Sequence, residues 1–305
     1  MRYENEFRDL LEEKVSDRTD RTFGFEYEFL GEKPLSKSDL ESVRACLPGI
    51  GFREIGGLTI NSSGLYVTFE PGGQIEFSSP PLKPDDVSSF DLLLEQIRES
   101  LEYIEKRSGI RYLPVGYIPG RNASPMLLEA LRYRNLHDLL GRTSDRGWDM
   151  MKGTAAIHFH AALCEFHELL KLWELMCSLS RDVKFAMGSE RRDIWNRTDP
   201  SRCGLTCSGA ENITSPEDLL VRLIDFALNA LDLERGIPFG SISPIPDFKD
   251  FLVHFTTIFT DVRLNTKGMT LELRTPDSRP LHLFRGAWIT FLDMVQRVMD
   301  DDQRF

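Results

Sequence analysis

Four long stretches of the chain repeat apolar residues at a spacing of three or four positions. This spacing places the apolar side chains on one face of an α-helix, so each stretch predicts an amphipathic helix. The first stretch is followed by Gly109, a residue type that suits the left-handed conformation after a helix end. The third begins at Ser215-Pro216, a favourable helix start. The predicted helices span residues 88–107, 165–181, 216–233 and 281–300.

Shorter segments have the alternation of β-strands, and Asn-Ser-Ser-Gly at residues 61–64 predicts a hairpin turn between two of them. These segments span residues 22–30, 58–61, 65–69, 74–78, 154–163 and 269–275. Strands and helices follow one another without a regular βαβ rhythm, which favours an α+β fold with a largely antiparallel sheet. No segment resembles a linker, so we expect a single domain over residues 1–305. The Pro- and Gly-rich stretch at 236–246 is expected to form a loop over the functional site.

Three of these strands have one apolar face and one strongly polar face. In a strand, residues i and i+2 point to the same side, so the aromatic residues at 23, 25, 27 and 29 indicate a core face. The opposite faces of the three strands carry Glu26, Glu28, His158, His160, Glu272 and Arg274. A further segment places Glu70 before a Pro-Gly-Gly turn and Glu76 after it.

Each of these patterns alone has an ordinary explanation, such as a solvated sheet face, a packed histidine pair or a salt bridge. A solvated sheet face usually contains Lys, Thr and Ser beside its acids, and the polar positions of these strands lack them. If the strands are neighbours, the acids repel one another and raise each other's pKa. Hard divalent cations relieve this conflict, so we expect about two or three Mg²⁺ or Mn²⁺ ions.

A second group of charged residues lies at 189–204, where four arginines fall within twelve residues around Trp195. The segment is either an exposed basic loop or an anion clamp, because guanidinium groups bind phosphate and carboxylate in a bidentate manner. Next to a carboxylate–metal sheet, the expected anion is a nucleotide polyphosphate. Arg263 is a further candidate. The sequence contains no Gly-rich phosphate-binding motif, so metals and arginines would have to hold the phosphates.

The composition excludes some classes of function. The formal net charge is -11, which is unsuited to binding a nucleic-acid backbone. The charged N-terminus has no apolar signal core, and no apolar run reaches membrane-spanning length, so we expect a cytoplasmic protein without a membrane partner. The five cysteines show no zinc-binding spacing and are expected to be reduced and mostly packed. Nothing in the sequence indicates an oligomeric state.

The motifs resemble those of the plant-type and actinobacterial glutamate–cysteine ligases, within the glutamine synthetase superfamily. The segments that carry the resemblance are Gly-Phe-Glu-Tyr-Glu at 24–28, Phe-Glu-Pro-Gly-Gly-Gln-Ile-Glu at 69–76, residues 147–154 and 189–204, Asp-Val-Arg at 261–263 and Leu-Glu-Leu-Arg at 271–274. They span most of the chain in the family order. The resemblance implies a single catalytic domain with a curved, mostly antiparallel sheet, helices on its convex face, and ATP, metal ions and glutamate on its concave face.

The resemblance also implies roles for individual residues. The implied metal ligands are Glu26, Glu28, Glu70, Glu76, His158 and Glu272. The residues implied to contact ATP or substrate are His160, Arg191, Arg202, Arg263 and Arg274, with Arg191, Arg202 and Arg274 as the catalytic set. The two histidines resemble those of glutamine synthetase, where the first binds metal and the second phosphate; the ligases usually carry Gln and Asn there. The chain is also shorter than typical members, so loops that recognise the acceptor amine are expected to be trimmed.

The family chemistry is activation of a glutamate γ-carboxylate by ATP as an acyl phosphate, followed by attack of an amine. The cysteine α-amino group is the default acceptor. Two alternatives remain: a guanidino phosphotransferase with the same architecture, and a non-catalytic descendant that acts as a binding protein. The nearly complete set of acids argues against the binding protein, which has no need for so many repelling carboxylates.

Overall fold

The computed structural model describes residues 3–205, 207 and 213–300. Its strands form one open sheet in the order β2-β3-β4-β5-β1-β7-β9-β8, with every pairing antiparallel and the short β6 paired to the end of β1. The strands are β1 Phe23–Gly31, β2 Arg53–Ile55, β3 Leu58–Ile60, β4 Tyr66–Phe69, β5 Ile75–Ser78, β6 Tyr112–Leu113, β7 Ile157–Ala162, β8 Val262–Asn265 and β9 Thr270–Leu273. The predicted α+β class and antiparallel sheet are confirmed.

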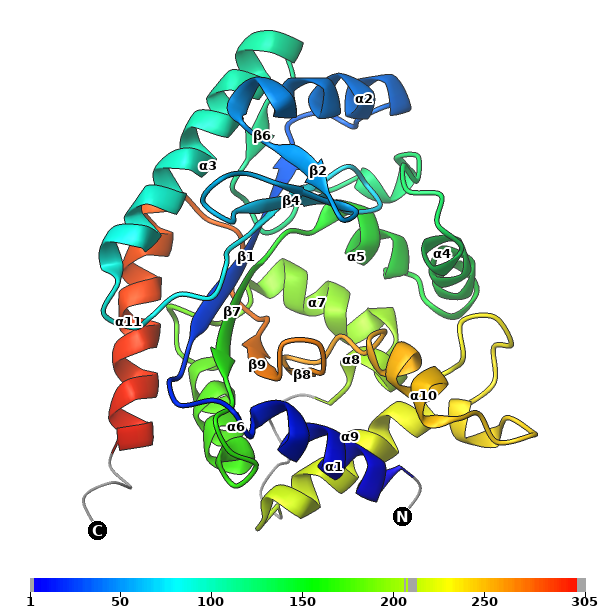
Figure 1. Ribbon diagram of the computed structural model, residues 1–305. Helices are drawn as coiled ribbons and strands as arrows, with labels where there is room; N and C mark the ends of the chain where they lie inside the picture. The colour runs from blue at the N-terminus through cyan, green and yellow to red at the C-terminus, as the bar shows by residue number, and fades with distance from the viewer. Residues whose placement is uncertain (1–2, 206, 208–212, 301–305) are drawn as a thin grey trace.

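Two long helices, α3 and α11, run along one side of the sheet (Figure 1). The α-helices are α1 Glu4–Val15, α2 Lys37–Cys46, α3 Val87–Ser108, α4 Leu131–Thr143, α5 Gly147–Gly153, α6 Glu168–Leu179, α7 Ser189–Thr198, α8 Pro200–Cys203, α9 Pro216–Asn229, α10 Phe248–Phe255 and α11 Leu281–Asp300. Short 3₁₀ turns lie at Leu47–Ile50, Arg121–Ala123 and Phe239–Ser241. Within the described residues, no helix combines the length and apolarity that crossing a membrane requires.

The aromatic face of β1 packs against α3 and α11, as its alternation predicts. The Phe25 ring lies 5.6 Å from Phe90 on α3 and 5.2 Å from Phe284 on α11, both in edge-to-face contact. Phe159 on β7 lies 5.7 Å from the same Phe284 ring. Burying rings of this size is a large hydrophobic contribution to stability, and their edge-to-face geometry adds to it. The opposite face of these strands is therefore directed away from the main core.

The four predicted helices are present, and their ends follow local capping. The Ser215 side chain accepts a hydrogen bond from the Asp218 backbone N–H at the start of α9, and Gly109 adopts φ 73° at the end of α3. The hairpin at 61–64 joins β3 to β4 as predicted, with the Gly64 N–H bonded to the Asn61 carbonyl. Helix α6 starts three residues later and ends two residues earlier than predicted, and α9 ends at Asn229 because Ala230 adopts an extended conformation.

Two expectations are wrong. The stretch at 236–246 contributes no residue to the two cavities described below; it packs at one end of the molecule, where the Phe239 ring stacks on His254 at 4.2 Å. The cysteines are not all reduced, because Cys177 on α6 forms a disulfide with Cys207. Sequence spacing could not indicate this pair, whose members are 30 residues apart and meet only when the chain folds.

Candidate active site

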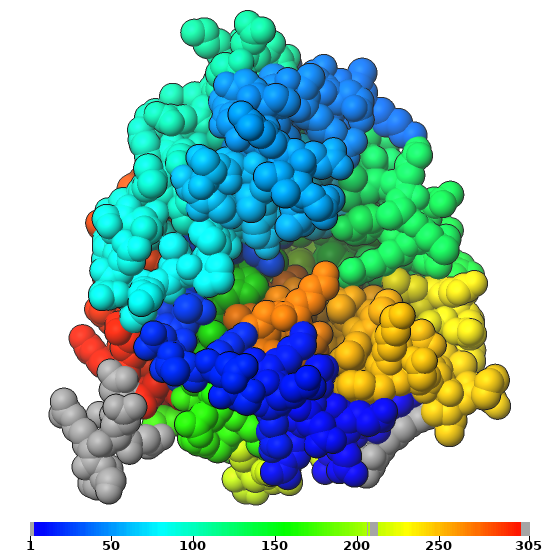
Figure 2. Space-filling model, viewed as in Figure 1, coloured from blue at the N-terminus to red at the C-terminus, as the bar shows by residue number. Residues whose placement is uncertain are grey.

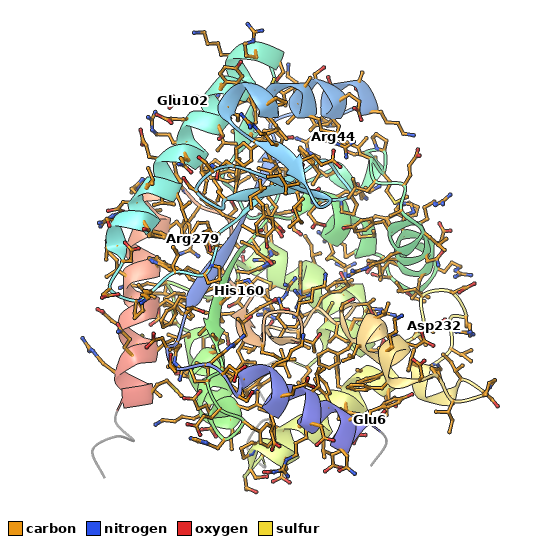
Figure 3. The ribbon with its side chains drawn as sticks, viewed as in Figure 1. Glu6, Arg44, Glu102, His160, Asp232 and Arg279 are labelled. Carbon is orange, nitrogen blue, oxygen red and sulfur yellow. A yellow bond between two sulfur atoms is a disulfide. The ribbon has the colours of Figure 1, made fainter. Side chains whose placement is uncertain are left out.

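Polar residues cross the sheet in three rows on the face opposite the aromatic one. The register of paired strands sets these rows, because directly paired residues point to the same side. The rows are Thr68–Glu76–Glu28, then Tyr66–Ser78–Glu26–His158, then Gly24–His160–Glu272–Arg263. The predicted convergence of the acids and imidazoles from four strands on one surface is confirmed, and Figure 3 places His160 near the centre of the molecule.

Glu26 lies between the two histidines of β7. Its Oε2 is 2.6 Å from His158 Nδ1, and its Oε1 is 3.6 Å from His160 Nε2. On the other side of His160, Nδ1 is 3.7 Å from Glu272 Oε1. Glu26, His160 and Glu272 each offer a ligand atom, and these atoms lie within 4.8 Å of one another. This group can hold a divalent metal ion.

The bonding of His160 supports that interpretation. The Nε2 atom is buried and has no hydrogen-bond partner among the described residues. A buried polar atom without a partner is unfavourable, and an ion or ligand would satisfy it. Carboxylate oxygens with imidazole nitrogen suit Mg²⁺ or Mn²⁺. This candidate metal-binding group contains His160, whereas the sequence resemblance implied His158 as the metal-ligating histidine.

Three other acids resist ionisation. Burial raises the pKa of Glu28 to about 7, against the opposing charge of Arg191. Burial and the neighbouring Glu28 and Glu26 raise the pKa of Glu70 to about 8. The pKa of Glu76 is also raised well above its usual value by burial and by Glu26 and Glu70. A bound cation would favour the ionised form of all three carboxylates and so would bind where the like charges conflict.

Glu26 and Glu272 differ from these three acids. Burial would raise the pKa of Glu272, but the Arg263 and His160 charges outweigh it and hold the pKa at about 2. Arg263 Nε donates to Glu272 Oε2 at 2.7 Å, and Arg274 Nη1 donates to the same oxygen at 3.0 Å. The His160 charge and the His158 hydrogen bond likewise overcome burial and lower the pKa of Glu26. The face therefore contains both ionised and protonated carboxyl groups.

The arginines of residues 189–204 do not act as one cluster. Arg191 is buried on α7, donates to the Thr275 and Arg274 carbonyls at 2.9 Å each, and lines the acidic cavity described below. Arg192 pairs with Asp261, and Arg197 is exposed. The helical conformation explains this separation, since neighbouring side chains point in different directions around the axis.

The prediction that Arg202 contacts phosphate or substrate is not supported by its position. Arg202 is fully buried, and it lines neither cavity of the described structure. Its guanidinium group donates to the Leu231 carbonyl and to Thr257, and its Nε lies 3.1 Å from Asp199. We therefore assign Arg202 a structural role, joining α8 to the segments after α9 and α10.

Two cavities open on the polar face, and Figure 2 shows the surface hollowed between the blue segments above and the orange β8–β9 turn below. The acidic cavity has a volume of about 340 Å³. The residues that define it include Glu26, Glu28, Glu70, Glu76, His158, Arg191, Trp195, Arg263 and Arg274. The apolar cavity is larger, about 940 Å³. Its lining includes Phe23, Leu58, Ile60, Val253, Phe255 and His160.

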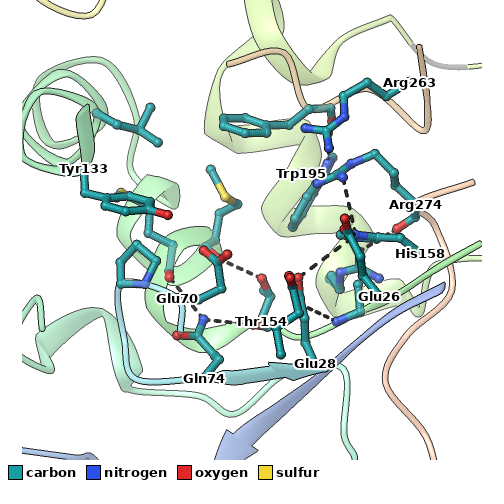
Figure 4. Close-up of a pocket in the computed structure, with 18 of the residues that line it drawn as sticks. Glu26, Glu28, Glu70, Gln74, Tyr133, Thr154, His158, Trp195, Arg263 and Arg274 are labelled. Atoms are coloured by element: carbon teal, nitrogen blue, oxygen red, sulfur yellow. Dashed lines mark hydrogen bonds and ion pairs between the residues drawn. The ribbon is translucent and has the colours of Figure 1, made fainter. Parts of the chain in front are cut away.

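Figure 4 shows the acidic cavity, with Glu26, Glu28 and Glu70 on one side of it and Trp195 and Arg263 opposite. Tyr133 on α4 also lines it and was not among the predicted site residues, because nothing in the local sequence distinguishes this tyrosine from an ordinary helix residue. Gln74, inside the Glu-Pro-Gly-Gly-Gln motif, donates to the Met151 and Thr154 carbonyls at 3.1 Å. It thereby joins the turn that positions Glu70 to the end of α5.

Comparison with known proteins identifies a family of enzymes. The model of the glutamate-cysteine ligase family 2 (GCS2) matches residues 22–180, just over half of the 305-residue chain. A chloroplastic glutamate–cysteine ligase of Nicotiana tabacum is 25% identical over 246 residues, covering 70% of this chain and 46% of that protein. Those of Medicago truncatula and Oryza sativa subsp. indica are 26% and 24% identical and are covered over 52% and 58% of their lengths. The chain spans about half the length of these relatives.

Proposed function

This chain belongs to the glutamate–cysteine ligase family 2, and on that premise we propose that it is an ATP- and Mg²⁺-dependent carboxylate–amine ligase. Its donor would be a glutamate γ-carboxylate and its default acceptor the α-amino group of cysteine. We further propose that residues 1–305 act as one catalytic unit and that the open sheet is of the glutamine synthetase type. The observation that carries the proposal is the set of three rows, which brings the acids and histidines of four strands to one cavity-lined face.

The proposed reaction has two steps. A γ-carboxylate oxygen bonds to the γ-phosphorus of ATP, the bond to the bridging oxygen breaks, and ADP leaves. The amine nitrogen then bonds to the acyl carbon, phosphate leaves with the bonding electrons, and the nitrogen loses a proton. Both steps develop negative charge on phosphoryl or carbonyl oxygens, which cations must stabilise.

The sheet supplies sites for these cations. Glu26, His160 and Glu272 would hold one ion, and His158 is a candidate ligand for a second because its Nε2 lies 3.9 Å from Glu28 Oε1. Glu28, Glu70 and Glu76 would complete the set of about two or three ions. When bound, Mg²⁺ or Mn²⁺ neutralises phosphate oxygens and stabilises the charge that develops on them. Arg191 and Arg274 line the same cavity and would contact carboxylate or phosphoryl oxygens.

The two cavities suit the two larger substrates. The apolar cavity has aliphatic walls at Leu58, Ile60 and Val253, which suit the adenosine part of ATP. The acidic cavity is smaller and holds the carboxylates with Arg191 and Arg274, which suits glutamate and its activated carboxyl group. The ATP phosphates would then lie where the two cavities meet.

The test is ADP release with ATP, Mg²⁺ and glutamate held fixed while the twenty amino acids and small amines are varied. We expect ADP formation to require glutamate, an amine and Mg²⁺, and mass spectrometry to detect a γ-glutamyl product. Removal of the metal with EDTA should stop the reaction, and excess Mg²⁺ should restore it. If no amine stimulates ADP formation, the ligase proposal is wrong; a phosphorylated guanidino product would support the phosphotransferase.

A further inference from the structure

The acidic and apolar cavities share only a small part of their lining. Among the described residues, four line both cavities, and we call these four the junction. The junction consists of Glu26, Arg132, Arg263 and Lys267. Three of its four members are cations, although the face as a whole is rich in acids. Any group that passes from a ligand in one cavity to a ligand in the other has to pass these side chains.

The three cations differ in how far their charge is compensated. Arg263 is paired with the buried Glu272, at 2.7 Å between Nε and Oε2. Within the described structure, neither Arg132 nor Lys267 forms an ion pair. Among the described residues, Arg132 donates only to the neutral Thr256 carbonyl, at 3.1 Å. Lys267 uses its backbone N–H to bond Asn265 Oδ1, at 3.0 Å, and its ammonium group has no hydrogen bond to a described residue.

The two unpaired cations come from separate parts of the fold. Arg132 lies in the first turn of α4, and Lys267 lies in the turn between β8 and β9. Figure 1 shows α4 at the right of the view, and β8 and β9 lower and nearer the centre. The Arg132 charge also reaches the acids, since it lowers the pKa of Glu70 against the larger upward effects of burial and neighbouring Glu28. Two positive charges therefore approach the junction from different elements.

We propose that Arg132 and Lys267 are catalytic residues that bind the γ-phosphoryl group during its transfer across the junction. This inference rests on the proposed function. As the bond from phosphorus to the β,γ-bridging oxygen breaks and a bond to the glutamate carboxylate oxygen forms, negative charge is spread over the three other phosphoryl oxygens. The guanidinium and ammonium groups would donate hydrogen bonds to those oxygens. Cations whose charge is not already compensated are best suited to this role.

The alternative is that both are ordinary solvated surface cations, since each is largely exposed. Variants distinguish the two interpretations. We expect Arg132→Ala and Lys267→Ala each to lower kcat for amine-dependent ADP formation by about 10²–10³-fold, the usual effect of removing one donor to a developing charge. Arg134→Ala, on the same helix, and Lys249→Ala, on α10, change exposed cations that line neither cavity, and both should keep nearly full activity.

A binding measurement tests the inference without an acceptor amine. With Mg²⁺ and glutamate present, ADP plus fluoroaluminate mimics the phosphoryl group in transfer. We expect Arg132→Ala and Lys267→Ala to weaken binding of ADP–fluoroaluminate by about tenfold or more, while binding of ADP alone changes by less than about threefold. Arg132→Lys, which keeps a charge, should recover part of the loss. If Arg132 had only a structural role, Arg132→Ala would change the thermal midpoint. The ratio of the affinity for ADP–fluoroaluminate to the affinity for ADP would stay as in the wild type.

The outcomes separate the inference from the proposed function. If the wild-type protein forms ADP with an amine and both variants match it in rate and in fluoroaluminate binding, the inference is wrong and the proposed function stands. If the wild-type protein binds neither ATP nor ADP in the presence of Mg²⁺, both are overturned. If both variants lose only the phosphoryl mimic, the inference is supported even when the acceptor amine has not been found.

Discussion

The two faces of strands β1 and β7 differ in almost every physical property, although their residues alternate along the same chain segments. On one face, Phe25 and Phe159 are buried against aromatic rings of α3 and α11. On the other, Glu26, His158 and His160 lie among further acids and arginines. The side chains of the aromatic face find all their packing partners within the protein and need no ligand. The polar face still contains protonated acids and an unpartnered His160 Nε2, which a ligand would satisfy.

This difference indicates how stability and function are divided within the sheet. Aromatic burial stabilises the fold. This stabilisation offsets the cost of crowding acids on the opposite side of each strand. Functional sites commonly keep such local conflicts, because a group that is satisfied by the protein has little left to offer a substrate or ion. Mutations on the polar face should therefore lower activity and spare stability, and mutations on the aromatic face should lower stability and spare activity.

The largest expected effect is on catalysis. Glu26→Gln and Glu76→Gln should each lower turnover to below about 10⁻⁴ of the wild-type rate, or more than about 5.5 kcal/mol of activation free energy, because each removes a proposed metal ligand. The free energy of unfolding should be unchanged or higher for Glu76→Gln, since Gln keeps an acceptor for Thr68 and Ser78 and cannot ionise among the neighbouring acids. ADP release and urea denaturation measure the two quantities.

The matched control for these variants is Glu54→Gln, an exposed acid on β2 that lines neither cavity and should keep full activity. If Glu26→Gln or Glu76→Gln retained activity, the polar face would not be the catalytic face. If both lost stability along with activity, the acids would be part of the structural framework and the contrast between the faces would fail.

The next effect is on stability, and it concerns the aromatic face. Phe284→Ala removes a buried ring that contacts Phe25 at 5.2 Å and Phe159 at 5.7 Å. We expect the free energy of unfolding to fall by about 3–5 kcal/mol, as for other buried Phe→Ala changes. Since Phe284 is on α11 and not on a strand, the register of the polar face should survive. Turnover of the folded variant at low temperature should therefore stay within about tenfold of wild type.

Leu283→Ala provides the comparison for Phe284→Ala, because Leu283 is adjacent on the same helix and 52% exposed. Its effect on unfolding should be below about 0.5 kcal/mol. Urea midpoints with constant m-values measure both changes. A large loss for Leu283→Ala, or none for Phe284→Ala, would show that the packing described for the aromatic face is not what stabilises the sheet.

The polar face could be predicted from the sequence because its signal has a period of two. Glu26, Glu28, His158, His160 and Glu272 each sit between apolar neighbours, so a strand has to direct them away from the core. Antiparallel pairing then brings them into rows. Their convergence required only that the strands be adjacent, which the mixed order of elements already favoured.

Arg132 and Lys267 of the junction, and the structural role of Arg202, could not be predicted in this way. Arg132 belongs to α4, which reaches the site through packing that no local pattern encodes. Arg202 lies in a motif of the family but is enclosed by carbonyl groups distant in sequence, at Leu231 and Thr257. The presence of an arginine in the sequence does not reveal whether its guanidinium group will bind a ligand or backbone carbonyl groups. Only the folded structure separates Arg202 from Arg191.

The smallest expected effect concerns the stability of the metal-free protein between pH 6.5 and 8.5. The pKa of Glu28 is raised to about 7 and that of Glu70 to about 8. The folded state thus binds more protons than the unfolded chain in this window, and this contribution to stability is lost as pH rises through the folded pKa values. The raised pKa of His160 acts in the same direction. The pKa values of Glu26 and Glu272 are lowered, so their contribution to the stability of the fold is lost only in acid and does not change in this pH window.

Saturating Mg²⁺ should restore the loss, because it binds the ionised carboxylates and competes with protons for them. The Mg²⁺-induced rise in thermal midpoint should therefore be larger at pH 8.5 than at pH 6.5, by a few degrees for a chain of this size. Differential scanning fluorimetry with EDTA-treated protein measures the rise, and Glu70→Gln should reduce the difference between the two pH values. An equal rise at both values, in the wild type and in Glu70→Gln, would mean that the cation binds away from the crowded acids. The polar face would then be as complete without a ligand as the aromatic face is.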